Sequence, residues 1–254
     1  MVAVNVEGAS RKDSSDCKDK MSIREKQRMI GRCVNLLHKK YGNKEKPTSR
    51  QIIEQVIFYH LHRAVNITSA RNVLRNLRSS YIDYNEVRIT KQQDLSRMLA
   101  QNGVPVEKSF LIKGFLRSIF DKESRLCLEH LKELDRERFY ERMSRIEGVD
   151  NAVIDYVRLC TFNEPILPLS EDVRRVLERY GVSVENMSGQ DAGGYHNYCK
   201  KVDFYQAFCL FVEHSQKVCL VDNPRCDKCV LAKTCSTAIK KRMEVRRKKT
   251  EEKK

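Results

Sequence analysis

Four cysteines near the C-terminus form the clearest metal-binding pattern in this chain. They are Cys219, Cys226, Cys229 and Cys235, spaced C-x6-C-x2-C-x5-C. Four thiols in so short a stretch can converge on one small object at little loop-closure cost. A tetrahedral zinc ion and a [4Fe–4S] cluster both take four sulfurs. Zinc sites usually pair two short C-x2-C knuckles, whereas a cluster has four separated iron corners, so the single C-x2-C favours the cluster, with zinc second and disulfides last.

The composition of the chain indicates its cellular compartment and the class of partner it binds. The 254-residue chain has no apolar run long enough to cross a membrane, and we expect a cytoplasmic protein in which cysteines are ligands or free thiols. A net charge of +15 favours a polyanionic partner, DNA or RNA. Tryptophan is absent and aromatics make up 7% of residues, which disfavours a stacking platform for single strands. The six other cysteines are interpreted as isolated thiols: Cys17, Cys33, Cys127, Cys160, Cys199 and Cys209.

Apolar residues recur mainly with helical spacing. No stretch alternates convincingly with a period of two, so the sequence predicts an all-α fold of roughly nine or ten short helices. Residues 1–20 are polar and are predicted to be a disordered tail, and residues 240–254 a basic tail. Thr48 with Gln51, and Thr90 with Gln93, have the spacing of capping boxes. We predict one long helix from Tyr195 to Lys217.

Two loops in the second half have the composition of binding loops. Gly148 and Val149 lie in a tight turn between two predicted helices, where the first amides of the next helix are unpaired and can bind phosphate. A plain interhelical turn would look the same. Further on, two prolines predict an extended loop that ends at Ser170, which caps a predicted helix over Glu171–Tyr180. Glu171 and Asp172 in its first turn suit the helix dipole, and a glycine, Gly181, stops it.

The order of these features resembles endonuclease III, within the helix–hairpin–helix DNA glycosylase superfamily. The hairpin, the P-x-x-P-L loop, the R-x-x-x-R helix and the four-cysteine loop follow one another as in that family, and His214 matches a family histidine. The resemblance implies a barrel lobe with the hairpin (48–164), an iron–sulfur lobe (21–47 and 165–239) and a cleft between them for double-stranded DNA.

The resemblance also shows what is missing. The family hairpin ends in a lysine that attacks the sugar as an amine, and the matching residue here is Ala152. The second hairpin glycine is Asp150, a negative charge where phosphate would bind. The family's catalytic aspartate corresponds to Ser170, which retains the cap but loses the charge. Losing one such electrostatic group typically costs about 100- to 1,000-fold in rate.

Other residues of the chain are candidates for the catalytic acid and for contacts with DNA. Glu171 and Asp172 are the possible substitute acids, with Asp150 a third. The resemblance suggests DNA contacts for Gly148, Val149, Arg174, Arg175, Arg225 and Lys228. A face formed by Arg71, Arg75 and Arg78, extended by Arg63, could bind phosphate or be a solvated surface. His60 and His62 lie near the place where the family replaces the extruded base.

The sequence therefore supports three hypotheses. We favour a monomeric, DNA-binding iron–sulfur protein of base-excision repair whose AP-lyase activity is lost. The first alternative is an active monofunctional glycosylase that uses a relocated acid. The second is a non-enzymatic redox or structural DNA-binding protein, although no second cofactor motif supports electron transfer.

Overall fold

The computed structural model describes residues 21–46 and 51–251, and these ranges are helical with no strand. The first α-helices are α1 (Ile23–Tyr41), α2 (Ile52–Ala64), α3 (Ile67–Ser80), α4 (Tyr84–Ile89), α5 (Gln92–Ala100) and α6 (Glu107–Glu123). They are followed by α7 (Arg136–Ser144), α8 (Asn151–Phe162), α9 (Glu171–Tyr180), α10 (Gly189–Gly193), α11 (Phe204–Lys217) and α12 (Ser236–Glu251). Three 3-10 helices are η1 (Glu129–Glu133), η2 (Gly194–Asn197) and η3 (Cys226–Lys228). The all-α prediction is confirmed.

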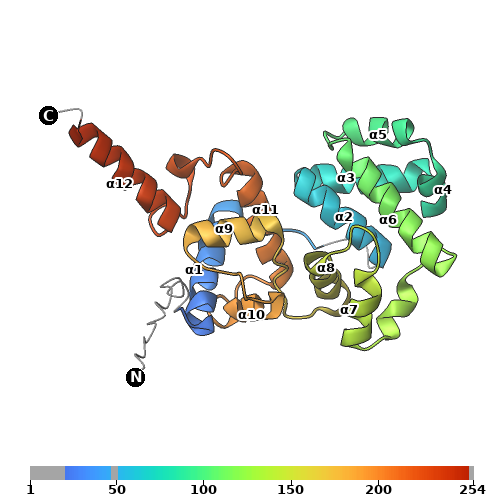
Figure 1. Cartoon of the computed structure of the whole chain (residues 1–254), viewed down its shortest axis with the longest axis horizontal. Coiled ribbons are helices and arrows are strands. Elements are labelled where there is room, and N and C mark those ends of the chain that lie inside the picture. The colour runs from blue at the N-terminus through green and yellow to red at the C-terminus, as the bar shows by residue number, and fades with distance from the viewer. Residues whose placement is uncertain (1–20, 47–50, 252–254) are drawn as a thin grey trace, which may run out of the picture.

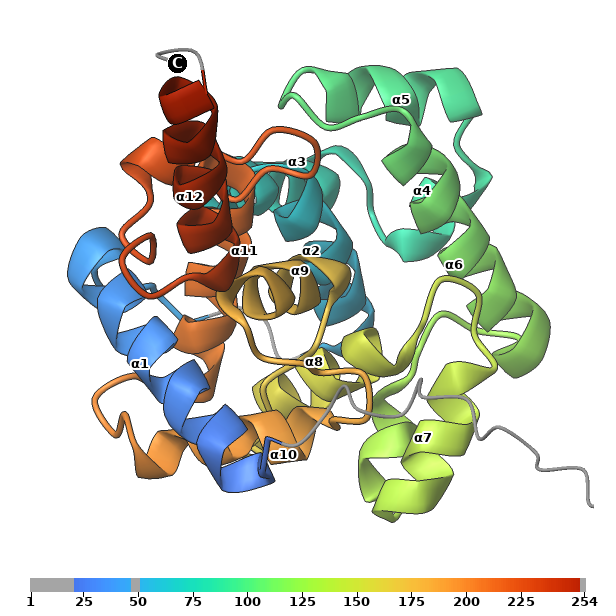
Figure 2. The same ribbon diagram turned by 60° about the vertical axis from the view of Figure 1, so that its left-hand side comes forward.

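The helices form two groups along the long axis of the molecule (Figure 1). Helices α2 to α6 lie together on one side, and α1, α9, α10 and α11 lie together on the other. Helix α8 packs against both α2 and α11, so it joins the two groups. Helix α12 packs against α9 only near its start and then projects from the body in both views (Figures 1 and 2). Among the described elements, the first helix, α1, belongs to the same group as α9, against which the last helix, α12, packs.

Side-chain caps explain where several helices begin. Asn66, Asp135, Asp150 and Ser170 each accept a hydrogen bond from an amide in the first turn of the helix that follows. Each cap satisfies one of the amides that a helix start leaves unpaired. The cap at Ser170 and the helix Glu171–Tyr180 agree with the sequence prediction.

Three local predictions need correction. The stretch Tyr195–Lys217 is not one helix, because η2 ends at Asn197 and α11 begins at Phe204. The capping box at Thr90 does not form, since α5 begins after Lys91 without a side-chain cap. The predicted box at Thr48 and the tail 1–20 fall outside the described residues, whereas most of the predicted basic tail belongs to α12.

Both groups of helices share one continuous hydrophobic core. Ile57 of α2, Tyr156 of α8 and Phe208 of α11 are each fully buried in it. The rings of Tyr59, Tyr156 and Phe208 contact one another with centroids 5.2 to 5.8 Å apart; Tyr59 and Phe208 are stacked, and Tyr156 is tilted against both. This aromatic contact holds α2, α8 and α11 together at the junction of the two groups. None of the described helices is long and apolar enough to span a membrane.

Candidate functional site

The four cysteines of the C-terminal loop line one small pocket. Cys219 follows α11, Cys226 begins η3, and Cys235 immediately precedes α12. Cys219, Cys226 and Cys229 are partly exposed and Cys235 is buried. The pocket is completed mainly by apolar side chains from α9, the loop and α12, together with Arg179 and His214. The fold therefore brings together all four sulfurs that the sequence singled out.

The surroundings of Cys219 and Cys229 shift the pKa values of their thiols. Burial raises the pKa of Cys229 to about 11 and also raises the pKa of Cys219. His214 Nε2 lies 3.5 Å from Cys229 Sγ, and its Nδ1 lies 2.9 Å from the hydroxyl of Tyr41. Burial therefore favours the protonated forms of Cys219 and Cys229, and Arg179, whose Nη1 lies 3.6 Å from Cys219 Sγ, opposes this effect at Cys219.

Four thiols around one pocket are a donor set whose chemistry fits a metal centre. Among the described residues, no three His, Cys, Asp or Glu side chains lie close enough together to hold a single metal ion. The same four thiols nevertheless surround one pocket. Thiolates are the ligands of iron–sulfur clusters, whose corners are separated in space. Cys219, Cys226, Cys229 and Cys235 are therefore the side chains that would hold a [4Fe–4S] cluster, and their role as its ligands stays a prediction.

The hairpin before α8 has the backbone shape that the sequence predicted. Gly148 has a φ of +76°, a value that favours glycine. Its carbonyl oxygen lies 2.9 Å from His60 Nε2, so neutral His60 donates a hydrogen bond to the turn. Asp150 Oδ1 accepts a hydrogen bond from the amide of Val153 at 2.8 Å. The carboxylate of Asp150 therefore accepts from one of the amides that could otherwise donate to a phosphate.

Helix α6 packs against this hairpin and carries a lysine that sequence reasoning missed. Leu111 and Gly114 of α6 lie beside Gly148 and Glu147, and Ser118 accepts a hydrogen bond from the amide of Glu147. Lys108 lies one turn before Leu111 on the same side of the helix. Burial and the charge of Arg63 lower the pKa of Lys108, although Asp172 and Glu171 oppose this. In the sequence, the one signal for Lys108 is its spacing of three residues from Leu111, which places both residues on one face of a helix.

Ala152 lines a polar pocket between the two groups of helices. The pocket has a volume of about 280 Å³ and is lined by residues of α7, α8, α9 and α10. Asp155, one helical turn after Ala152, is buried and accepts a hydrogen bond from the hydroxyl of Tyr140. Burial raises the pKa of Asp155. The position of the family lysine thus opens onto a pocket that contains a buried carboxyl group, which the sequence did not indicate.

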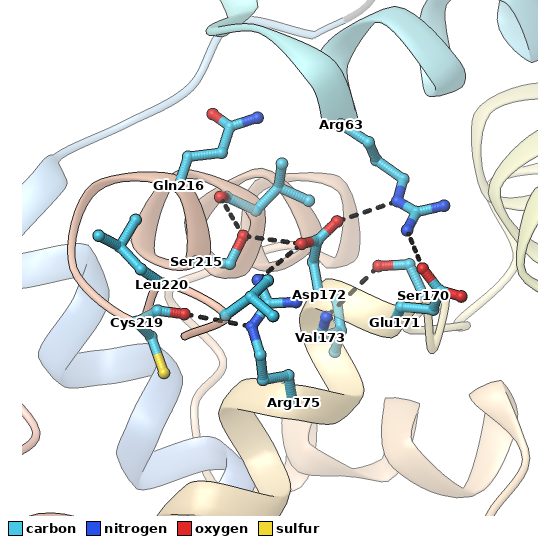
Figure 3. Close-up of polar contacts among 12 residues, drawn as sticks. Arg63, Ser170, Glu171, Asp172, Val173, Arg175, Ser215, Gln216, Cys219 and Leu220 are labelled. Atoms are coloured by element: carbon cyan, nitrogen blue, oxygen red, sulfur yellow. Dashed lines mark hydrogen bonds and ion pairs between the residues drawn. The ribbon is translucent and has the colours of Figure 1, made fainter. Parts of the chain in front are cut away.

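Ser170 caps the start of α9 and lies beside a network of polar contacts that we call the Arg63 network (Figure 3). Its members are Arg63, Glu171, Asp172, Arg175, Ser215 and Cys219. Arg63 Nε donates to Asp172 Oδ2 at 2.9 Å, and Arg175 Nη2 donates to Asp172 Oδ1 at 2.8 Å. Arg175 Nε donates to the backbone carbonyl of Cys219 at 3.2 Å. The network therefore runs from α2, through α9, to the cysteine loop.

The possible substitute acids have very different surroundings in this network. Burial alone would raise the pKa of Asp172, but hydrogen bonds and charge from Arg63 and Arg175 outweigh it and lower the pKa. Asp172 is therefore an ionised structural anchor. The side chain of Glu171 is 87% exposed, and its contact with Arg63 is an ion pair at the surface. Ser170 is buried, and its hydroxyl oxygen accepts from the amide of Val173.

The basic residues expected at DNA divide into two classes. Arg174 donates to the carbonyls of Leu169 and Val184, each at 3.0 Å, and Arg175 is bound within the Arg63 network. Both guanidinium groups therefore already have internal partners. Arg225 and Lys228 of the cysteine loop are exposed. We retain the DNA contacts of these four residues as predictions, and the exposed pair is better placed for them.

Two other suggestions from the sequence are disfavoured by burial and pairing. His60 is 6% exposed and His62 is 2% exposed, so neither projects from the surface to replace an extruded base. Arg78 binds the buried carboxylate of Glu54, and Arg71 binds Glu45. The basic face on α3 is thus largely neutralised within the protein.

Comparisons with known proteins agree with this geometry. No model of a known protein family matches the sequence. Endonuclease III from Sulfolobus acidocaldarius is 28% identical over 104 residues, which are 41% of this chain and 47% of that protein. The chain thus matches about half the length of this curated relative. It is endonuclease III-like.

Solved structures extend the likeness over most of the chain. A non-covalent endonuclease III–DNA complex matches 86% of this chain and 98% of its own, with a TM-score of 0.55 and 18% identity. A trapped covalent endonuclease III–DNA intermediate matches 85% and 98%, with the same TM-score and identity. A thermostable thymine-DNA glycosylase matches 86% and 100%, with a TM-score of 0.54 and 16% identity. These similarities establish an endonuclease III-like fold.

Proposed function

We propose that this chain is a DNA-binding iron–sulfur protein of base-excision repair that has lost AP-lyase activity. The observation that carries the loss is Ala152, which lines the pocket where the resemblance places an amine nucleophile. A methyl group cannot form a Schiff base with a sugar aldehyde. Ser170, at the position of the family aspartate, serves as a helix cap and carries no charge.

The proposed division of labour follows the two groups of helices. Residues 48–164 form the barrel lobe with the hairpin, and 21–47 with 165–239 form the iron–sulfur lobe. The four loop cysteines hold the [4Fe–4S] cluster, which when bound would cross-link the loop between α11 and α12. Double-stranded DNA, damaged or intact, is the partner, and the net charge of +15 supports binding to its phosphates. We expect the protein to act as a monomer.

A second candidate function is favoured by the pocket at Ala152. A monofunctional glycosylase needs an acid near the scissile bond and no amine. Asp155 is a buried carboxyl group that lines this pocket, and burial favours its protonated form. Glu171, one residue after Ser170, is an exposed acid in the same region whose partner is Arg63. A relocated acid could therefore cut the glycosidic bond of a base extruded into the pocket.

One set of assays separates these functions. Purified protein is incubated with duplexes that contain oxidised pyrimidines, mismatches or abasic sites, and products are resolved before and after alkali treatment. Binding without base loss supports the DNA-binding function. Base loss that needs alkali for strand cleavage supports the monofunctional glycosylase. Strand cleavage without alkali would contradict the proposed loss of AP-lyase activity.

A further inference from the structure

Arg63 is held in place before any ligand arrives. It lies in the last turn of α2, and its side chain is 16% exposed. Nε is bound to Asp172 at 2.9 Å, and the guanidinium carbon lies 5.5 Å from the centroid of the Tyr59 ring. A guanidinium fixed in this way loses little freedom when it binds a further group. Its remaining edge faces the carboxylate of Glu171, which accepts from Nη2 at 3.0 Å (Figure 3).

The two carboxylates that contact Arg63 are bound with different strength. The side chain of Asp172 is 14% exposed and has additional partners in Arg175 and Ser215. The side chain of Glu171 is 87% exposed and, within the described part of the chain, makes no other hydrogen bond or ion pair. Exposed ion pairs contribute little to stability because water competes for both partners. Glu171 is therefore the exchangeable partner and Asp172 the permanent one.

We propose that Arg63 binds a single DNA phosphate, with Asp172 holding the guanidinium and Glu171 leaving it when the duplex binds. This inference rests on the proposed DNA-binding function. A phosphodiester offers two oxygens in the planar geometry that a guanidinium recognises. Glu171 thus acts in the free protein as a removable substitute for phosphate.

A second positive charge near Arg63 favours an anion at this place. Lys108 of α6 is partly buried and, among the described residues, its amine makes no hydrogen bond or ion pair. Burial lowers the pKa of Lys108, and the positive charge of Arg63 lowers it further. A phosphate near both relieves this repulsion and adds a favourable interaction with each. Displacement also leaves Glu171 as a free carboxylate next to Ser170.

Neighbouring carboxylates should have opposite effects on DNA affinity. Glu171→Gln removes the competitor, so we expect duplex affinity to rise about threefold. Asp172→Asn removes the same charge but loosens Arg63, so affinity should fall about fivefold. Glu178→Gln is the matched control, because Glu178 is exposed on the same side of α9 seven residues further on. A general electrostatic effect would raise affinity by a similar factor in all three variants, and this result would overturn the proposal.

The salt dependence of binding provides the second measurement. Arg63→Ala should lower the slope of log affinity against log salt by about 0.9, the value for one phosphate contact. Glu171→Gln should leave the slope unchanged. Arg63→Lys retains the positive charge but not the planar guanidinium that can donate two parallel hydrogen bonds to a phosphate. We therefore expect affinity to fall about tenfold with little change in slope.

The failures of the two proposals are distinguishable. If the wild-type protein binds no duplex, the proposed function itself is wrong and this inference falls with it. If the wild-type protein binds DNA with a steep salt slope but Arg63→Ala has the same slope, only this inference is wrong. Circular dichroism of each variant excludes unfolding, and if Asp172→Asn does not fold, the Arg63 and Glu171 variants decide the matter.

Discussion

The cysteine loop and the hairpin region differ in how much of the chemistry expected from the resemblance their side chains can supply. In the loop, all four sulfurs that a [4Fe–4S] cluster would need line one pocket. In the hairpin region, Gly148 has a positive φ and Ser170 caps α9, while the resemblance predicts an amine and an acid at the positions of Ala152 and Ser170. The difference teaches that the fold and the catalytic groups are separable. A cap needs only an oxygen, whereas a Schiff base needs an amine.

The largest expected effect comes from the cysteine loop. Cys226→Ala removes one ligand, so we expect loss of iron and of soluble, folded protein together, because metal binding and folding are coupled. Iron content, visible absorbance and thermal melting measure this. Cys127→Ala is the matched control, since Cys127 is a partly exposed thiol outside the loop. A folded, iron-free Cys226→Ala protein would show that the loop does not depend on a cluster.

In the hairpin region we expect the opposite result. Substitutions that introduce the family's catalytic groups should give a new activity and leave the fold unchanged. The wild-type protein should give no covalent adduct when it is incubated with abasic-site DNA and borohydride. The double variant Ala152→Lys with Ser170→Asp restores both family groups, and we expect trapping to rise by about 100-fold or more. Ala152→Lys alone should trap less. An efficient adduct with the wild-type protein would show that another amine has taken over.

A third test concerns the support of the hairpin. Burial lowers the pKa of His60 to about 4, with help from Lys108, and burial likewise lowers the pKa of His62 to about 4. Each histidine has an ordinary pKa near 6.5 when unfolded, so below this pH the unfolded chain binds protons that the folded protein excludes. Stability is therefore full above pH about 6.5 and falls as the pH decreases towards about 4.

The expected loss is roughly 2 kcal/mol per histidine between pH 7 and pH 5. Urea melts at the two pH values measure it. His60→Gln retains a donor for the Gly148 carbonyl but cannot titrate, so its pH dependence should be smaller by one histidine's share. A wild-type free energy of unfolding that does not change between pH 7 and pH 5 would contradict this explanation.

The smallest effect distinguishes the exposed basic residues of the loop from the paired ones of α9. Arg225→Ala and Lys228→Ala should each lower the salt slope of duplex binding by about 0.9 without altering sequence preference. Arg174→Ala should instead reduce thermal stability, because its guanidinium binds two backbone carbonyls. If Arg225→Ala and Lys228→Ala leave the slope unchanged, the cysteine loop does not contact DNA.

Much of the helical fold could be read from local patterns. The helix Glu171–Tyr180, its cap at Ser170 and the glycine after it were predicted because propensity, capping and dipole all agree there. The break before α11 was not predicted. The segment Gly189–Asn197 forms short helices beside α1, where Gly31 lies against Tyr195 and Tyr198. This packing is tertiary, so periodicity could not indicate it.

By itself the sequence determined the all-α class, the set of four cysteines and the absence of a lysine at position 152, because these depend on residue types and spacing along the chain. Only the tertiary structure decided the roles of the charged residues. It makes Asp172 a buried anchor of Arg63 and Glu171 an exposed partner of the same guanidinium, and it places Asp155 in the pocket at Ala152. The physical reason is that burial and pairing set the chemistry of a charged group, and residues distant in the sequence supply both.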